Sequence, residues 1–219
     1  MTTHRARATA AALTALAATL ATAGAAHATA APAPQPRAVS VPSVFSDGSF
    51  ETPTAPVKSF TTRTAGQTIG PWTVTKGSVD HVGAGYWAAA EGDQSVDLNG
   101  GQAGGVAQTF ATTPGTRYRV TYSVAGNYSA GPAVKTGRVL VNGDEAQSFS
   151  FDSTGKTAVD MGYSTESFEF SAVVPQTTLT FDSTTGTAAA PSAYGPVLDA
   201  VSVTPECCDK CSGTAAPAL

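Results

Sequence analysis

Apolar and polar residues alternate along short runs through most of the chain after about residue 45. If the run RYRVTYSV is extended, one of its faces carries four apolar or aromatic residues: Tyr118, Val120, Tyr122 and Val124. Its other face carries Arg117, Arg119, Thr121 and Ser123. A two-residue period is typical of half-buried β-strands. Since this region shows no convincing 3.6-residue period of an amphipathic helix, the pattern predicts an all-β domain.

Further runs with the same alternation predict the remaining strands. The pairs expected to share a face are Phe149 with Phe151, Phe168 with Phe170, and Leu179 with Phe181. The run VLDAVSV is expected to align Val197, Val201 and Val203. Asn142-Gly143 suits the positive φ angles of a hairpin turn. Many short strands at near-regular spacing predict an antiparallel β-sandwich, a jelly roll of about eight to ten strands.

The two ends of the chain differ in composition from this middle part. Residues 1–30 combine two arginines with an Ala/Leu-rich stretch and A-x-A sites, the order of a secretory signal peptide. This apolar run is too short and too Ala-rich to span a bilayer. Residues 31–43 read as a Pro/Ala-rich linker. We therefore predict a folded domain over residues 44–205 and a flexible tail over 206–219, in a protein secreted to the extracellular space or cell surface.

The charge of the chain limits its partners. It carries 12 basic and 16 acidic residues, and without Arg5 and Arg7 of the predicted signal peptide the net charge is −6. A mildly acidic secreted domain argues against nucleic acid or an anionic membrane as the partner.

All three cysteines, Cys207, Cys208 and Cys211, lie in the tail. An extracellular disulfide framework would place pairs inside the domain. A structural zinc site needs four ligands, and no histidine is nearby. The sequence leaves open one local disulfide and a spare thiol that could link to another chain; otherwise we expect a monomer.

Few residues could support catalysis by a nucleophile or a metal. His81 is the one histidine after the predicted signal peptide, and no serine lies in a nucleophile-elbow motif. One histidine is too few for a catalytic zinc site. We therefore expect His81 to be a surface or strand-end residue.

A glycosidase with two carboxylates is a further possibility. The stretch YWAAAEGDQSVDLNGG offers Glu91, Asp93 and Asp97. In a strand, Val96 and Leu98 would point one way and Asp97 the other, toward solvent. An exposed carboxylate on a strand is ordinary, so this reading ranks below a binding role.

Carbohydrate binding fits the residue types better, because it uses aromatic rings for the apolar face of a sugar and polar groups for its hydroxyls. The candidate ligand-binding residues are Tyr86, Trp87, Asn127 and Tyr128, which fall in Gly-rich, loop-like segments. Trp87 could instead close the end of the core, and Tyr128 could anchor a loop. Gln108 shares a face with apolar neighbours and must be hydrogen-bonded there, either as a core residue, which we favour, or as a cleft residue.

Several motifs occur in a familiar order: DGSFETP, GPWTVTKGSVDHVG, YWAAAEGDQSVDLNG, GGVAQTFATTPGTRYRVTYSVAGN, FSFDSTG, MGY and YGPVLDAVSV. They resemble the choice-of-anchor C family of secreted bacterial proteins, which is similar to the plant cell-wall family called domain of unknown function 642. The match runs from about Val44 to Val203. It implies a galactose-binding-like jelly roll, secretion and association with wall polysaccharide, with no established catalytic residues. The Cys-containing tail stands where the family has sortase motifs or hydrophobic anchors, so no membrane span is expected in the mature form.

The alternation in the last strand predicts a buried carboxylate, which could bind a metal ion. Asp199 shares a face with Val197, and a buried carboxylate must be paired, protonated or metal-bound. Galactose-binding-like jelly rolls often hold Ca²⁺ between an N-terminal Gly-x-Phe-Glu and a C-terminal Leu-Asp, and Glu51 and Asp199 match these positions. We therefore predict a structural calcium ion at Glu51 and Asp199. The alternative is that Asp199 caps backbone amides at a strand end.

Together these observations predict a secreted, non-catalytic β-sandwich module that binds carbohydrate or cell-wall polysaccharide. An extracellular protein-interaction or surface-structural module without a glycan ligand is the alternative, and a glycosidase ranks third.

Overall fold

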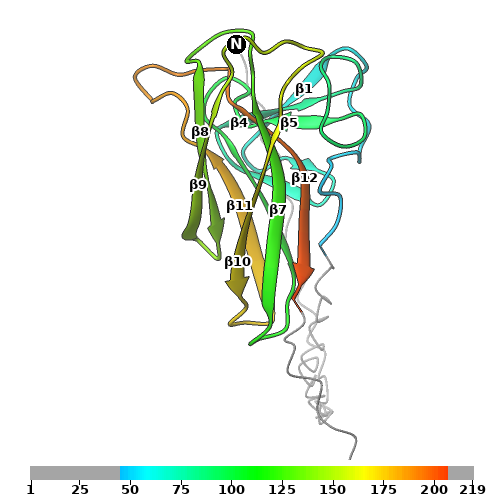
Figure 1. The fold of residues 1–219 in the computed structure, drawn as a ribbon, viewed down its shortest axis with the longest axis vertical. Coiled ribbons are helices and arrows are strands. Elements are labelled where there is room, and N and C mark those ends of the chain that lie inside the picture. Colours follow the sequence, from blue (N-terminus) through cyan, green and yellow to red (C-terminus); the bar gives the residue numbers. More distant parts are fainter. Residues whose placement is uncertain (1–44, 207–219) are drawn as a thin grey trace, which may run out of the picture. The chain divides into compact units, whose positions relative to one another are not determined.

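The computed structural model describes residues 45–206. The predicted signal peptide and linker and the three tail cysteines lie outside the described residues. Within 45–206 the chain forms twelve strands in two six-stranded sheets (Figure 1). The predicted all-β, antiparallel jelly-roll sandwich is confirmed, but it has more strands than expected because two of them, β2 and β5, are only two and three residues long. No helix in this part of the chain is long and apolar enough to cross a membrane.

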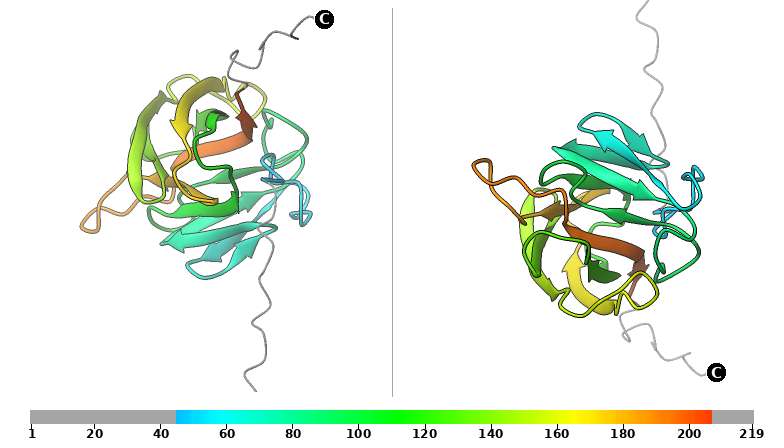
Figure 2. Two further views of the ribbon diagram at one scale, coloured as in Figure 1. Left: turned by 90° about the horizontal axis from the view of Figure 1, so that it is seen from below. Right: turned by 90° about the horizontal axis from the view of Figure 1, so that it is seen from above.

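Sheet A has the strand order β1-β4-β5-β12-β7-β10, and sheet B the order β2-β3-β6-β11-β8-β9. The strands of sheet A are β1 (Phe60–Thr64), β4 (Ser78–Val82), β5 (Ser95–Asp97), β12 (Pro196–Pro205), β7 (Arg117–Gly126) and β10 (Ser164–Ser171). Those of sheet B are β2 (Thr68–Ile69), β3 (Trp72–Lys76), β6 (Gly105–Ala111), β11 (Gln176–Ser183), β8 (Val134–Val141) and β9 (Asp144–Asp152). The loop that joins β11 to β12 extends away from both sheets (Figure 2, orange).

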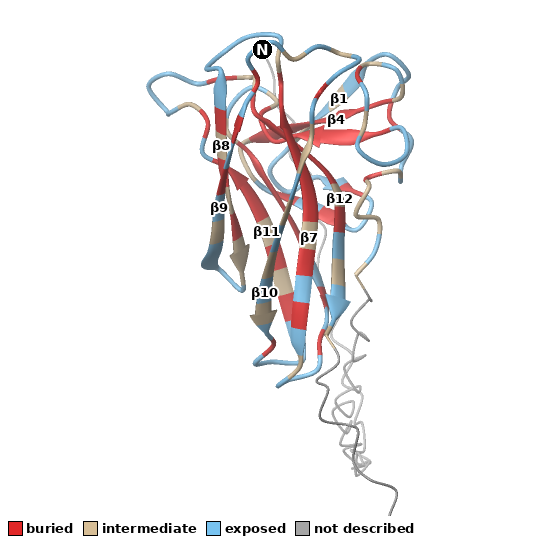
Figure 3. Ribbon diagram, in the orientation of Figure 1, coloured by how far each residue is buried: buried red, intermediate tan, exposed pale blue. Residues whose placement is uncertain are grey.

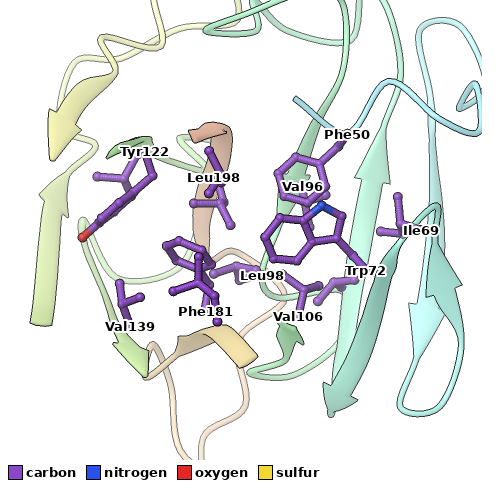
Figure 4. Close-up of a cluster of buried hydrophobic side chains, with 14 of the residues drawn as sticks. Phe50, Ile69, Trp72, Val96, Leu98, Val106, Tyr122, Val139, Phe181 and Leu198 are labelled. Atoms are coloured by element: carbon purple, nitrogen blue, oxygen red, sulfur yellow. The ribbon is translucent and has the colours of Figure 1, made fainter. Parts of the chain in front are cut away.

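The main core lies between the two sheets and is built by the alternation seen in the sequence. Its largest fully buried side chains include Trp72, Tyr122, Phe50, Phe110 and Phe181 (Figure 4). The other predicted strand faces also point to this core, since Leu179 is buried in it and Phe168 and Phe170 pack against it. Phe149 also belongs to the main core, but its predicted partner Phe151 packs in a second cluster. Each of these apolar side chains contributes about 1.5–3 kcal/mol when fully buried.

Two local predictions are confirmed by the backbone and side-chain geometry. The hairpin turn between β8 and β9 has positive φ at Asn142 (53°) and Gly143 (94°). Gln108 is buried, and its amide exchanges two hydrogen bonds of 2.9 Å with the backbone of Ser46. Its polar groups are therefore satisfied inside the core.

One half of sheet A is buried on both faces. Along β7, exposed and buried residues alternate from Arg117 to Val120, but every residue from Tyr122 to Gly126 is buried (Figure 3). All residues of β4 and β5 are buried as well. A second apolar cluster covers the outer face here: Val82, Trp87, Ala125, Phe151, Met161 and Val197. Loops from outside the sheet therefore form an additional layer.

A β-bulge in β12 changes which side chains face the core. The pairing of β12 with β7 shifts between Asp199 and Ser202, and Ala200 has a φ of 49°. Val197 consequently packs in the outer cluster, whereas Val201 belongs to the main core. The prediction that these valines share one face is therefore wrong, because the extra residue of the bulge reverses the alternation.

The positive φ of Ala200 gives a testable consequence. A non-glycine residue in this region carries strain of order 1–3 kcal/mol. Ala200→Gly should therefore raise the free energy of unfolding by about 0.5–1 kcal/mol, net of the greater chain entropy of glycine. Urea unfolding measures the change. The matched control is Ala111→Gly on the regular strand β6, which should lose about 0.5–1 kcal/mol; equal losses at both positions would contradict a strained bulge.

Candidate functional site

The loop over residues 83–94 covers the outer face of sheet A where β1, β4 and β5 lie side by side (Figure 1). Tyr86 and Trp87 come from this loop. The Trp87 indole donates a 2.8 Å hydrogen bond to Ser95 Oγ on β5. The amide of Ala88 donates to the carbonyl of Ala158 at 2.7 Å, which ties the loop to the neighbouring segment. The aromatic residues are thus fixed against the sheet.

Two carboxylates hold the far end of this loop by its backbone. Asp199 Oδ2 accepts hydrogen bonds from the amides of Ala90 (2.7 Å) and Glu91 (3.0 Å). Glu51 Oε1 accepts from the amides of Asp93 and Gln94, both at 2.8 Å. Hydrogen bonds to an ionised acceptor are about twice as strong as neutral ones. The loop is therefore anchored at four backbone donors, two on each side of Gly92, without using its own acidic side chains.

A pocket with a volume of ≈ 190 Å³ opens beside these aromatic residues. Its lining residues are Phe60, Asp80, Val82, Tyr86, Trp87, Asp97, Gly100, Asn127, Ala193 and Tyr194. They come from strands β1, β4 and β5 and from four loops. The volume is below the roughly 300–1,000 Å³ of pockets for drug-sized ligands, so it suits a smaller group.

One wall of the pocket is aromatic. The ring of Phe60 lies edge-on to Tyr86, with centroids 5.6 Å apart and planes at 83°. Tyr86 in turn lies 5.0 Å from Trp87 at 71°. Phe60 stands on the edge strand β1 and is 41% exposed. An apolar ring face is therefore available to a ligand.

Two carboxylates form the polar part of the pocket. Asp80 on β4 and Asp97 on β5 are direct cross-strand partners. Thr62 Oγ1 donates to Asp80 Oδ1 at 2.6 Å, and no other donor among the described residues reaches the Asp80 carboxylate. Burial raises the pKa of Asp80, and the bond from Thr62 acts in the opposite direction.

Asp97 differs from Asp80 because its oxygens are occupied by the protein. Asn127 Nδ2 donates to Oδ2 at 2.7 Å, and the amides of Asn99 and Gly195 donate to Oδ1 at 2.9 and 3.1 Å. The pKa of Asp97 is raised to about 7, because burial and the charge of Asp80 raise it more than the three donors lower it. Asp97 therefore organises the loops around the pocket.

A buried lysine lies behind Asp97. Lys135 is fully buried, and its Nζ donates a 2.8 Å hydrogen bond to the carbonyl of Ala130. Burial lowers the pKa of Lys135, while the negative charge of Asp97 acts to raise it. Lys135 does not line the pocket.

The structure brings three of the four predicted ligand-binding residues to the pocket. Tyr86, Trp87 and Asn127 line it, whereas Tyr128 packs against the outer apolar cluster. Trp87 is almost fully buried in that cluster, so it also closes the core, as its alternative reading proposed. Asn127 Oδ1 accepts from the amide of Ser129, so the Asn127 side chain shapes its own loop.

Sequence reasoning missed Phe60 and Asp80. The alternation in the runs FTTRT and SVDHV does show that Phe60 lies on the same strand face as Thr62, and Asp80 on the same face as Val82. Only the pairing of β1 with β4, which sets Thr62 opposite Asp80, brings these residues together. Tyr194, from the loop before β12, also lines the pocket.

Two expectations about polar residues are wrong. Asp97 does point away from Val96 and Leu98, but it is only 1% exposed, because loops cover the outer face. His81 is buried rather than at the surface, and its Nε2 lies 2.8 Å from the carbonyl oxygen of Phe50. Burial lowers the pKa of His81, which favours a neutral, structural imidazole.

The predicted calcium ligands Glu51 and Asp199 lie near each other, since the charge of Glu51 helps to raise the pKa of Asp199. Burial is the main cause, and it raises that pKa to about 7. Asp199 accepts hydrogen bonds from backbone amides, as in the alternative to a calcium site in which this residue caps backbone amides. In residues 45–206, no group of three or more His, Cys, Asp or Glu side chains could hold a metal ion. A calcium ion here would need main-chain carbonyls for most of its ligands.

These features define an antiparallel jelly-roll β-sandwich with an aromatic and acidic pocket on the outer face of one sheet. The chain belongs to the family described as Protein of unknown function (DUF642), whose model matches residues 43–204. The resemblance to the domain of unknown function 642 is therefore confirmed.

Further similarities were found with one curated protein and with solved structures. Halomucin from Haloquadratum walsbyi is 30% identical over 167 residues, which cover 74% of this chain and 2% of halomucin. A family 35 carbohydrate binding module from Clostridium thermocellum is 14% identical, with a TM-score of 0.45, over 65% of this chain and 97% of that one. CBM35 from Paenibacillus barcinonensis is 20% identical, with a TM-score of 0.41, over 66% and 98%.

The pKa of Asp97 predicts how stability depends on pH. Its folded value of about 7 exceeds the unfolded value of 3.8, so its contribution is full below pH 3.8 and is lost as the pH rises through 7. The domain should lose on the order of 2–3 kcal/mol of unfolding free energy from this group between pH 5 and pH 8. The pKa of Asp199 is also raised to about 7, so this residue lowers the unfolding free energy over the same pH range. Urea unfolding at both pH values should show a smaller loss for Asp97→Asn, and an unchanged loss for the exposed control Asp144→Asn. The same loss in wild type and Asp97→Asn would contradict the role of Asp97.

The calcium prediction is tested by thermal unfolding after treatment with a chelator. An ion that binds only the folded state raises the melting temperature as its concentration increases. Asp199→Asn should abolish most of this gain, whereas the exposed neighbour Glu91→Gln should keep it. No shift at millimolar calcium, together with no bound metal by elemental analysis, would refute the site at Glu51 and Asp199.

Proposed function

We propose that the protein is a secreted carbohydrate-binding module whose pocket holds one sugar residue of a polysaccharide, such as that of a cell wall. The observation that carries this proposal is that an aromatic wall, made by the exposed Phe60 and the half-buried Tyr86, lies beside a carboxylate, Asp80, that has capacity for further donors. A sugar presents both a C–H face and hydroxyl donors, and these two surfaces match that pair.

The aromatic wall supplies the stacking surface. Large aromatic side chains are normally buried, and their exposure in a concave site indicates a ligand. Phe60 is held by its edge contact with Tyr86, so its ring is already positioned for a ligand. Such preorganisation lowers the entropic cost of binding.

Asp80 and Asn127 supply the polar contacts. The Asp80 side chain is only 8% exposed, and its second carboxylate oxygen can accept a hydrogen bond from a sugar hydroxyl. One of the two amide hydrogens of Asn127 is bound to Asp97, which leaves the other for a ligand oxygen. Few polar groups in a partly apolar pocket are the usual arrangement for fixing ligand orientation.

A neighbouring hollow extends this surface. It shares Tyr86 and Trp87 with the pocket, and its other lining residues are Gly85, Ala88, Ala158 and Val159. These small and apolar side chains offer room for the next sugar residue of a chain. An oligosaccharide is therefore a better ligand than a free monosaccharide.

Binding is favoured over hydrolysis by the state of Asp97. A glycosidase needs two carboxyl groups that face the scissile bond. Asp97 already accepts three hydrogen bonds from Asn99, Asn127 and Gly195, so it has little capacity left for a substrate. The side chains of Glu91 and Asp93 are exposed and do not line the pocket.

The test measures how strongly the full-length protein is retained on insoluble polysaccharides and on glycan arrays. Phe60→Ala and Tyr86→Ala should each weaken binding by about 5- to 150-fold, the equivalent of the 1–3 kcal/mol lost when a ring that stacks on a base is truncated. Phe60→Ala is the sharper variant, because Phe60 is exposed and its loss should leave the melting temperature nearly unchanged. Trp87→Ala would also remove core packing and the bond to Ser95.

Val173→Ala, at another exposed apolar residue outside the pocket, is the matched control. Retention that is equal for wild type and both aromatic variants would place the site elsewhere. Release of reducing sugars would favour the glycosidase, and no retention on any polysaccharide would refute the proposal.

A further inference from the structure

The pocket contains acidic side chains but no basic ones. Asp80 and Asp97 are its charged lining residues, and no Lys, Arg or His among the described residues lines it. They are cross-strand partners, and the charge of Asp80 helps to raise the pKa of Asp97. A ligand that enters therefore meets two carboxylates at close range.

The nearest basic side chains do not cancel this charge at the pocket wall. Lys135 is buried behind Asp97 and bonded to Ala130, so it offsets at most one of the two charges. Lys58 lies beside Gly85 at the neighbouring hollow. Arg63 follows Thr62 on β1, so it points to the opposite face of the sheet, where its charge acts on His81.

The polar partner open to a ligand is an acceptor. Asp80 is more than nine-tenths buried, it lines the pocket, and Thr62 is its one donor within residues 45–206. Gly100 leaves space beside it, since a Cβ at that position would lie 3.0 Å from Asp80 Oδ1. An ionised carboxylate accepts hydrogen bonds and cannot donate them.

We propose, on the basis of the proposed function, that the pocket selects its sugar by charge: it takes neutral or amine-bearing sugar residues and rejects uronic acids, with Asp80 as the specificity-determining residue. A sugar hydroxyl or ammonium group gives Asp80 the donor that it lacks. A uronate carboxylate would face two like charges with no cation to pair with, and such juxtaposition strongly disfavours binding. The pocket thus combines an attractive contact with a repulsive one.

The experiment is a binding array of oligosaccharides of glucose, galactose, xylose, mannose, N-acetylglucosamine, glucosamine, glucuronate and galacturonate, probed at pH 8, above the pKa of about 7 of Asp97. The wild type should retain neutral or amine-bearing glycans, and uronates of the same linkage should bind at least about tenfold more weakly. Asp80→Asn keeps the acceptor for Thr62, and it should narrow this ratio to less than about threefold while weakening the amine-bearing glycans. Asp93→Asn removes an exposed carboxylate of the loop over residues 83–94 that does not line the pocket, and it should leave the ratio unchanged.

The outcomes separate the two proposals. Retention of uronates as strong as that of neutral glycans would overturn charge selection and leave the carbohydrate-binding function intact. An unchanged ratio in Asp80→Asn, or an equal change in Asp93→Asn, would also overturn the role of Asp80. No retention of any glycan would refute the proposed function and this inference together.

Discussion

The hydrogen bonds from two backbone amides to the Asp199 carboxylate are the interaction on which the outer face of sheet A depends. They hold the loop that carries Tyr86 and Trp87 against strands that would otherwise face solvent. Without this layer, the buried residues of the outer cluster would be exposed on a sheet face. Together with the bonds from Glu51 to the same loop, this interaction converts a two-layer sandwich into a local three-layer structure with a pocket.

Asp199 can do this because of the bulge that follows it. The extra residue leaves Asp199 on the outer face and returns Val201 to the main core. The amide of Val201 donates to the carbonyl of Gly48, which brings the N-terminal segment with Glu51 alongside β12. Both carboxylates that anchor the loop are thus placed by one backbone irregularity, in keeping with the occurrence of bulges beside functional sites.

The fold was predictable where the information was local. The alternation in β7 and the Asn142-Gly143 turn depend on neighbouring residues, and both predictions hold. The alignment of Val197 with Val201 failed, because a bulge is set by pairing with β7 and not by the strand's own sequence. The burial of Asp97 was missed for a similar reason, since loops from distant parts of the chain cover its face.

The site was predictable in part for the same physical reasons. Tyr86 and Asn127 could be chosen because aromatic and amide residues in Gly-rich segments often form binding surfaces. Phe60 and Asp80 could not, because each looks like an ordinary strand residue until β1 pairs with β4. A pocket built on the outer face of a sheet requires the strand order, which period-two patterns do not contain.

The acidic groups of the domain fall into two kinds, and the difference bears on function. Asp199 is fully buried and Glu51 is half-buried, and both accept hydrogen bonds from backbone donors of the loop that they hold. Asp80 is nearly as buried as Asp199 but has a single donor from Thr62, and it faces a second carboxylate. A buried charge with incomplete hydrogen bonding destabilises a fold. A ligand that donates to Asp80 would restore part of this free energy, so sugar binding and domain stability should be coupled through that one side chain.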